Sequence, residues 1–196
     1  MKILSTRKAI LALLWLIPIA RVFADGSFFA NGFTFEIMKD QCSVSLTKYE
    51  TIPTIDYSQP LHIPSSVTHE GKTYSVKRIK THAFKDITEI QSVVIDEGIE
   101  NLGEYVFERC VNLKSISIPA SVECLGKGLF GSCYHLTLIK VDEKNECFDS
   151  RDGANAIIDS ENDELLVACS STKIPASVKS IADFAFYHCN VMEQIV

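Results

Sequence analysis

The chain has 196 residues, of which 46% are hydrophobic and 22% charged, a size and composition that suit one folded domain. Nine Gly and six Pro are too few for a collagen-like or low-complexity chain, whereas eleven Phe and six Tyr can fill a core. The formal charge of −6 excludes the strongly basic proteins that bind nucleic acid by releasing counterions, so we expect no nucleic-acid partner.

Residues 1–24 have the three parts of a secretory signal peptide. Basic residues precede an apolar run at 9–20, and the small residues Val22 and Ala24 follow it. A twelve-residue helix spans roughly 18 Å, which is too short for a hydrocarbon core of about 30 Å. We therefore predict cleavage after Ala24, a secreted or cell-surface location, and no membrane span after signal removal. Four of the nineteen Lys and Arg and none of the twenty-five Asp and Glu lie in this segment, so the mature chain carries a formal charge of −10.

Residues 25–57 form a region of their own before any repeat begins. Strand-like runs occur at 33–38 and 42–46. We interpret this region as an N-terminal β cap, because the first strand of a repeat array otherwise leaves an open edge that invites aggregation.

A repeat of twenty-three residues organises the chain from 58 to 196. Phe84, Phe107 and Phe130 are each twenty-three residues apart, and Phe186 follows after a longer interval. Aliphatic residues recur five residues before and six residues after the first three of these Phe residues. The aligned unit reads L-x-x-I-x-I-P-x-x-V-x-x-L-x-x-x-A-F-x-x-C-x-x-L, and a fixed period of this kind is typical of stacked repeats.

Each unit predicts a short strand followed by a short helical turn. Ile116 and Ile118 alternate with serines and precede Pro119, which suits the end of a strand because proline cannot donate to a β-ladder. Apolar residues from 125 to 133 have helical spacing. One unit cannot bury its own apolar edge, so we predict an α/β repeat solenoid: a leucine-rich-repeat stack that forms a β-dominated parallel ribbon with short helical turns and Phe packed on Phe.

Three irregularities interrupt the array. The turn residues Glu70-Gly71-Lys72 predict a small hairpin in the first copy. About ten extra residues lie between Asp142 and Pro175, with a strand-like run at 155–158. At the far end, Ile195 occupies a strand position with nothing after it to cover the edge, so we expect the array either to be truncated at the C-terminus or to be covered by something else.

The copies SISIPASVECLGKGLFGSCYHL and KIPASVKSIADFAFYHCNVM resemble the BspA-type leucine-rich repeats of bacterial and protozoan surface proteins. The resemblance covers about residues 58–196. It implies a secreted or surface-attached interaction protein, several members of the family being implicated in adhesion, and it brings no catalytic residue. Asp96 and Asp142 stand where the family usually has Pro.

Seven Cys, an odd number, leave at least one thiol unpaired. Cys110 with Cys133 and Cys124 with Cys147 are each one repeat apart, and adjacent strands about 4.8 Å apart permit disulfides between such pairs. Cys at the position three after Phe also behaves well as a small buried apolar residue. Both states stay open from spacing alone, and we favour the buried thiol.

No motif for catalysis, for a cofactor or for a metal is present. H-E-x-x-H, C-x-x-C, G-x-S-x-G and the glycine patterns that bind phosphate are all absent. We predict a non-enzymatic chain with no catalytic residue, no cofactor and no metal site. The alternatives are a secreted hydrolase or hydrolase inhibitor on the same scaffold, and a fragment of a larger surface protein.

The outward positions of the repeated strands are the candidate binding site. Alternation places six residues there, and we expect them to dock a protein or a glycan at a surface or in the extracellular matrix. These residues are Ser92, Val94, Ser115, Ser117, Leu138 and Lys140.

Overall fold

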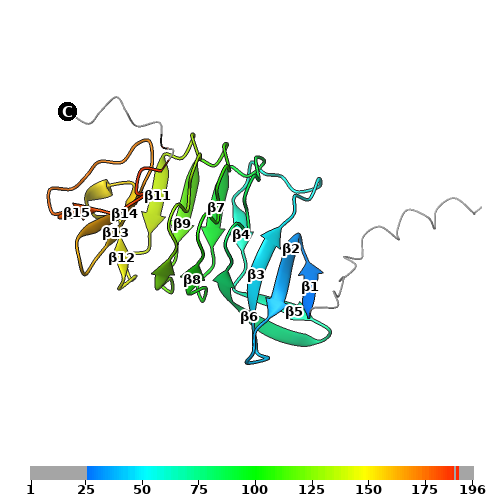
Figure 1. The fold of residues 1–196 in the computed structure, drawn as a ribbon. Helices are drawn as coiled ribbons and strands as arrows, with labels where there is room; N and C mark the ends of the chain where they lie inside the picture. Colours follow the sequence, from blue (N-terminus) through cyan, green and yellow to red (C-terminus); the bar gives the residue numbers. More distant parts are fainter. Residues whose placement is uncertain (1–25, 188, 190–196) are drawn as a thin grey trace, which may run out of the picture.

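The computed structural model describes residues 26–187 and residue 189 (Figure 1). The expected signal peptide at 1–24 and the expected open edge at Ile195 lie outside the described residues. The strands of the repeats stand side by side in chain order along the long direction of the molecule (Figure 1). They form a strand-rich repeat fold with almost no helix.

Sheet A combines the N-terminal strands with strands of the first three repeats. Its order is β1-β2-β3-β6-β8-β10, and β5 pairs with β6 outside this path. The pairs among β1, β2 and β3 are antiparallel, whereas β3, β6, β8 and β10 pair in parallel. The strands are β1 (Ser27–Ala30), β2 (Phe33–Ile37), β3 (Ser43–Tyr49), β5 (Ser66–His69), β6 (Lys72–Ile79), β8 (Asn101–Leu102) and β10 (Cys124–Leu125).

Sheet B holds the predicted strand of every copy except the last one and is parallel throughout. Its order is β11-β9-β7-β4. Ser92 is the register partner of Ser115, and Ser115 of Leu138, so the twenty-three-residue period of the sequence is also the register of the sheet. The strands are β4 (Leu61–Ile63), β7 (Ser92–Ile95), β9 (Ser115–Ile118) and β11 (Leu138–Val141).

Sheet C combines strands of the segment inserted between the third and fourth repeats with β15 of the fourth repeat. Strands β12, β13 and β14 pair antiparallel, and β14 pairs in parallel with β15. The strand expected at 155–158 is β13, and the hairpin expected at Gly71 joins β5 to β6. The elements are β12 (Phe148–Asp149), the 3-10 turn η1 (Arg151–Gly153), β13 (Ala156–Asp159), β14 (Glu164–Ala168) and β15 (Ser180–Ile181).

The short helical turn predicted for 125–133 is absent: consecutive turns follow β10 instead. In the first three repeats the residues two before and two after the Phe have a left-handed backbone, as has the residue two before Phe186, and this breaks helical continuation. The Phe84 N–H donates to the Val106 carbonyl and the Phe107 N–H to the Leu129 carbonyl, both at 2.9 Å, so these amides bond to the next repeat rather than along a helix. The left-handed residues are His82, Asp86, Tyr105, Arg109, Gly128, Ser132 and Phe184.

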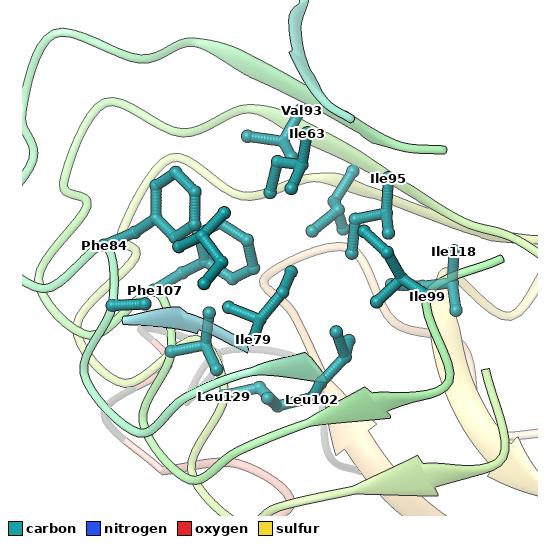
Figure 2. Packing of buried hydrophobic residues seen from close by; sticks show 14 of the residues in the cluster. Ile63, Ile79, Phe84, Val93, Ile95, Ile99, Leu102, Phe107, Ile118 and Leu129 are labelled. Atoms are coloured by element: carbon teal, nitrogen blue, oxygen red, sulfur yellow. The ribbon is translucent and has the colours of Figure 1, made fainter. Parts of the chain in front are cut away.

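A ladder of aromatic rings fills the core between sheets A and B. The Phe84 and Phe107 ring centroids lie 5.0 Å apart, and those of Phe107 and Phe130 lie 5.7 Å apart. Tyr49 of β3 continues the ladder at 5.3 Å from Phe84. Figure 2 shows aliphatic side chains of both sheets, among them Ile63 of β4, converging on Phe84 and Phe107.

Phe186 does not join this ladder, contrary to the expectation of Phe on Phe through every repeat. It packs on a separate buried cluster formed by residues of sheet C and its flanks. The cause is β14, which takes the position of the preceding repeat: the Ala168 N–H donates to the Ala185 carbonyl at 2.8 Å, as the Tyr49 N–H donates to the Ala83 carbonyl.

The N-terminal strands and sheet C are two versions of one arrangement. In each, an antiparallel hairpin ends in a strand that pairs in parallel with the following repeat, namely β3 with β6 and β14 with β15. The strands expected near 33–38 and 42–46 are β2 and β3. Whether residues 25–57 act as a cap stays a prediction.

Candidate interaction surface on sheet B

The outer face of sheet B carries the six residues predicted from alternation. Ser92, Ser115 and Leu138 are register partners in one row, and Val94, Ser117 and Lys140 form a second row. The four residues on β7 and β9 are partly exposed, Leu138 is 49% exposed, and Lys140 is exposed. The structure therefore brings all six residues together on one face, while their role in binding is untested.

Burial on the opposite side explains why this face points outward. The residues between the six point inward and are at most 6% exposed: Val93, Ile95, Ile116, Ile118, Ile139 and Val141. Because side chains alternate across a strand, burying this apolar set fixes the orientation of the other set.

Hydrogen bonds order the polar part of the face. The Oγ atoms of Ser92 and Ser115 lie 2.7 Å apart, so one hydroxyl donates to the other. A second pair joins His62 Nδ1 to Asp96 Oδ1 at 3.2 Å. Sequence reasoning missed His62, although LHIP aligns with SISIP and places His62 in the row of Val94 and Ser117.

The two Asp residues that replace Pro in the repeat have a structural role. The Asp96 N–H donates to the Ile63 carbonyl at 3.0 Å, and the Asp142 N–H donates to the Ile118 carbonyl at 2.9 Å. Pro119, at the equivalent position, cannot donate. Each Asp thus extends the ladder of sheet B by one hydrogen bond.

A groove of about 520 Å³ borders the face where sheet B ends. All four residues of β11 line one wall, and residues 149–153 with Asn155 line the other. On that second wall the Arg151 guanidinium bonds to Asp149 and Asp163, so this cation is already neutralised.

A second hollow, of about 450 Å³, lies on sheet A and was not foreseen. It includes Arg78, for which the described residues show no ion pair, and the exposed thiols of Cys42 and Cys124. At its rim, hydrogen bonds from the Ser43 hydroxyl and from the Cys42 and Ser43 amides lower the pKa of Asp40 to about 2. Local sequence patterns give no signal for this hollow, because its lining residues come from β3, β6, β8 and β10, which are far apart along the chain.

The cysteines are free thiols, all seven of them within the described residues. The Cys110 thiol donates to the Phe84 carbonyl and the Cys133 thiol to the Phe107 carbonyl, each at 3.1 Å. Burial raises the pKa of Cys133 to about 12 and that of Cys110 further. The structure favours the buried-thiol interpretation for Cys110 and Cys133, and such thiols are poor nucleophiles. Cys124 is exposed and Cys147 partly exposed, and both are also free thiols.

Over residues 26–187 and 189, no group of three His, Cys, Asp or Glu side chains is placed to hold a metal ion. In the same part of the chain, no helix has the length and apolar character needed to cross a bilayer.

The fold and its register define a strand-rich protein of stacked 23-residue repeats with an exposed parallel sheet. Six copies of the BspA type Leucine rich repeat region match residues 62–160 and 164–196. The chain belongs to this family.

Several solved structures resemble this chain, and the first of them shows the same fold. A leucine-rich repeat protein from Bacteroides ovatus superimposes with a TM-score of 0.56 at 22% identity, over 80% of this chain and 37% of that one. A leucine-rich repeat protein from Bacteroides capillosus gives 0.47 at 26% identity, over 60% and 99%, and the pneumococcal vaccine antigen PcpA gives 0.38 at 17%, over 83% and 62%. The chain thus spans 37% of the length of the Bacteroides ovatus protein. No curated protein sequence matches significantly.

Proposed function

We propose that this chain is a secreted or cell-surface interaction module that binds a protein or a glycan, without catalysis, through the outer face of sheet B. The observation that carries the proposal is the convergence of Ser92, Ser115 and Leu138 in one row and of Val94, Ser117 and Lys140 in the next. Family membership supports a surface role, because the BspA-type resemblance implies surface-attached interaction proteins.

The chemistry of the face suits binding better than reaction. Hydroxyl groups, one apolar side chain at half exposure and one ammonium group offer hydrogen bonds and contact area. Within the described residues, no serine hydroxyl of either row is hydrogen-bonded to a His or Lys side chain, which is the contact that activates a nucleophile. A repeated flat sheet also suits an extended macromolecular partner, since repeat proteins present continuous surfaces.

Arrays of purified matrix proteins and of glycans test the proposal. The mature chain is labelled, and each binder is then measured against the double variant Ser115→Arg, Ser117→Arg, which we expect to weaken binding at least tenfold without unfolding. The matched control is Ser75→Arg with Asn101→Arg, which places the same two charges on sheet A, where both residues line the other hollow. Equal binding by the sheet B variant, or loss confined to the sheet A variant, contradicts the proposed face.

A further inference from the structure

We propose that β11 is a docking edge at which an extended, basic peptide segment of a partner protein adds as the next strand of sheet B. The inference rests on the proposed function, because it names the kind of partner that the same surface takes. It starts from the end of the parallel ladder, where β11 pairs with β9 on one side and, among the described residues, with no strand on the other.

The sequence would place the fourth repeat on this edge, but the structure leads it away. Residues 171–174 are the repeat equivalents of Ser115–Ile118, yet they form no strand. The Ser170 hydroxyl still donates to the Leu136 carbonyl at 2.8 Å, whereas by Lys173 the backbone N–H donates to Ala154 of the inserted segment at 3.0 Å. Ile174 is consequently 44% exposed, while its equivalent Ile118 is 1% exposed.

The diverging chain leaves the groove of about 520 Å³ along the whole of β11. A strand rises about 3.3 Å per residue and lies about 4.8 Å from its neighbour. Four added residues therefore match the four residues of β11, Leu138–Val141. The inserted wall at 149–155 closes the groove on its far side.

Backbone groups on the groove side of β11 have few hydrogen-bond partners among the described residues. In a parallel strand, alternate residues direct both their N–H and their carbonyl to one side. The Leu138 N–H donates to the Lys114 carbonyl, on the side of β9. The backbone N–H and carbonyl groups of Ile139 and Val141 therefore point to the opposite side, toward the groove. The Ile139 carbonyl accepts from the Ser150 hydroxyl at 3.2 Å. Across the described residues, no hydrogen bond engages the Ile139 N–H or either backbone group of Val141.

Charge selects the occupant. Asp142, Glu143 and Asp152 line the groove, and within the described part of the chain none of them forms an ion pair. Lys140 is the one lining cation left after Arg151 is neutralised. The excess of carboxylates favours a segment that carries Lys or Arg, and the exposed Leu138 side chain offers an apolar neighbour. Alternating basic and β-branched residues meet both requirements and favour the extended conformation.

Amide hydrogen exchange tests the inference directly. The probe is an acetylated and amidated hexapeptide of alternating valine and lysine, added to the mature chain and followed by NMR. We expect exchange at Ile139 and Val141 to slow at least about tenfold, while the amide of Ile116, which lies inside the sheet, is unchanged. A peptide of the same sequence with every backbone amide methylated keeps the charges, but it has no N–H donors and its methyl groups hold it away from β11. It should leave both amides unprotected.

Variants separate charge from pairing. Asp142→Asn with Glu143→Gln and Asp152→Asn keeps the shape of each side chain and should weaken peptide binding about threefold or more. Glu123→Gln removes one carboxylate from the hollow on sheet A and should change nothing. Unaltered exchange at Ile139 and Val141 overturns the inference. Protection of both amides by self-association without peptide, seen as concentration dependence, also overturns it.

The outcomes distinguish this inference from the proposed function. If Ser115→Arg with Ser117→Arg abolishes binding to an array partner while the peptide leaves β11 unprotected, the proposed binding face is supported and the proposed docking edge is refuted. If the peptide protects β11 while the face variant binds every array partner normally, the proposed docking edge is supported and the proposed binding face is refuted.

Discussion

Phe107→Ala removes the centre of the aromatic ladder and should be the most damaging single truncation of a repeat. The Phe107 side chain is fully buried, with its ring 5.0 Å from that of Phe84 and 5.7 Å from that of Phe130. Truncating a buried Phe costs about 3–5 kcal/mol, comprising the lost transfer free energy and the cavity. Because rings lie on both sides of it, we expect the upper half of that range.

The thermal consequence follows from the size of the chain. For domains of 150–250 residues, each kcal/mol lowers Tm by about 2–4 °C, so the variant should lose about 8–20 °C. Unfolding of the mature chain in urea and by circular dichroism on heating measures both quantities. If the repeats unfold separately, the transition will broaden instead of shifting as one.

Phe184→Ala is the matched control, because the Phe184 side chain is 45% exposed and lies outside the ladder. It should cost less than about 1 kcal/mol. Equal destabilisation by the two variants would refute the assignment of the ladder as the core that joins the repeats.

Three further predictions concern the backbone, a buried amide and the thiols. In Gly126→Ala the new Cβ would lie 2.4 Å from backbone atoms of the preceding repeat. We therefore expect the free energy of unfolding, measured in urea, to fall by about 1–3 kcal/mol. In the control Gly153→Ala the new Cβ meets no atom within 4 Å, so only the left-handed backbone conformation disfavours the alanine, by about 1 kcal/mol. Asn145 donates to the Pro119 and Val122 carbonyls at 2.9 Å and accepts from the Cys147 and Phe148 amides; Asn145→Ala leaves these groups without partners and should cost at least about 2 kcal/mol, measured by the same assay. Since burial raises the pKa of Cys133 to about 12, the folded thiol keeps its proton above pH 9, where the unfolded thiol loses it, so stability should be full below about pH 9 and fall as pH rises towards 12. Alkylation of the native chain should then modify Cys124 and spare Cys133, and equal rates at the two thiols would contradict their assigned burial.

The repeat could be predicted from sequence because its signal is a distance along the chain. Phe84, Phe107 and Phe130 recur at one interval, and strands with equal intervals stack in register, so the parallel sheet and the outer face followed from counting. The position of the six face residues was confirmed for the same reason: alternation along a strand leaves each side chain one of two directions.

The turn after each short strand could not be predicted in this way. Leu125, Leu129 and Cys133 have helical spacing, yet Gly128 and Ser132 adopt left-handed conformations. The carbonyls of Lys127, Leu129 and Gly131 accept hydrogen bonds from amides of the preceding repeat. Local spacing describes which residues are buried, whereas the hydrogen-bond partners of the backbone are set by a chain segment one repeat away.

The fate of Phe186 shows the same limit at the scale of a whole repeat. By sequence it is the fourth member of the aromatic ladder. In the structure β14 takes the place of the preceding repeat, and Ala168 bonds to Ala185 in the repeat that contains Phe186. Nothing in the spacing of Phe residues reveals that the inserted residues themselves occupy a place in the stack.

The sequence by itself therefore determined the period, the strands of sheet B and the face they present, because each depends on spacing within one chain segment. The tertiary structure alone decided where the aromatic ladder stops, which thiols are buried, and that an open groove lies along β11. Those features depend on how inserted segments compete with repeats for the same hydrogen bonds and the same apolar contacts, and that competition is settled only when all the strands are packed together.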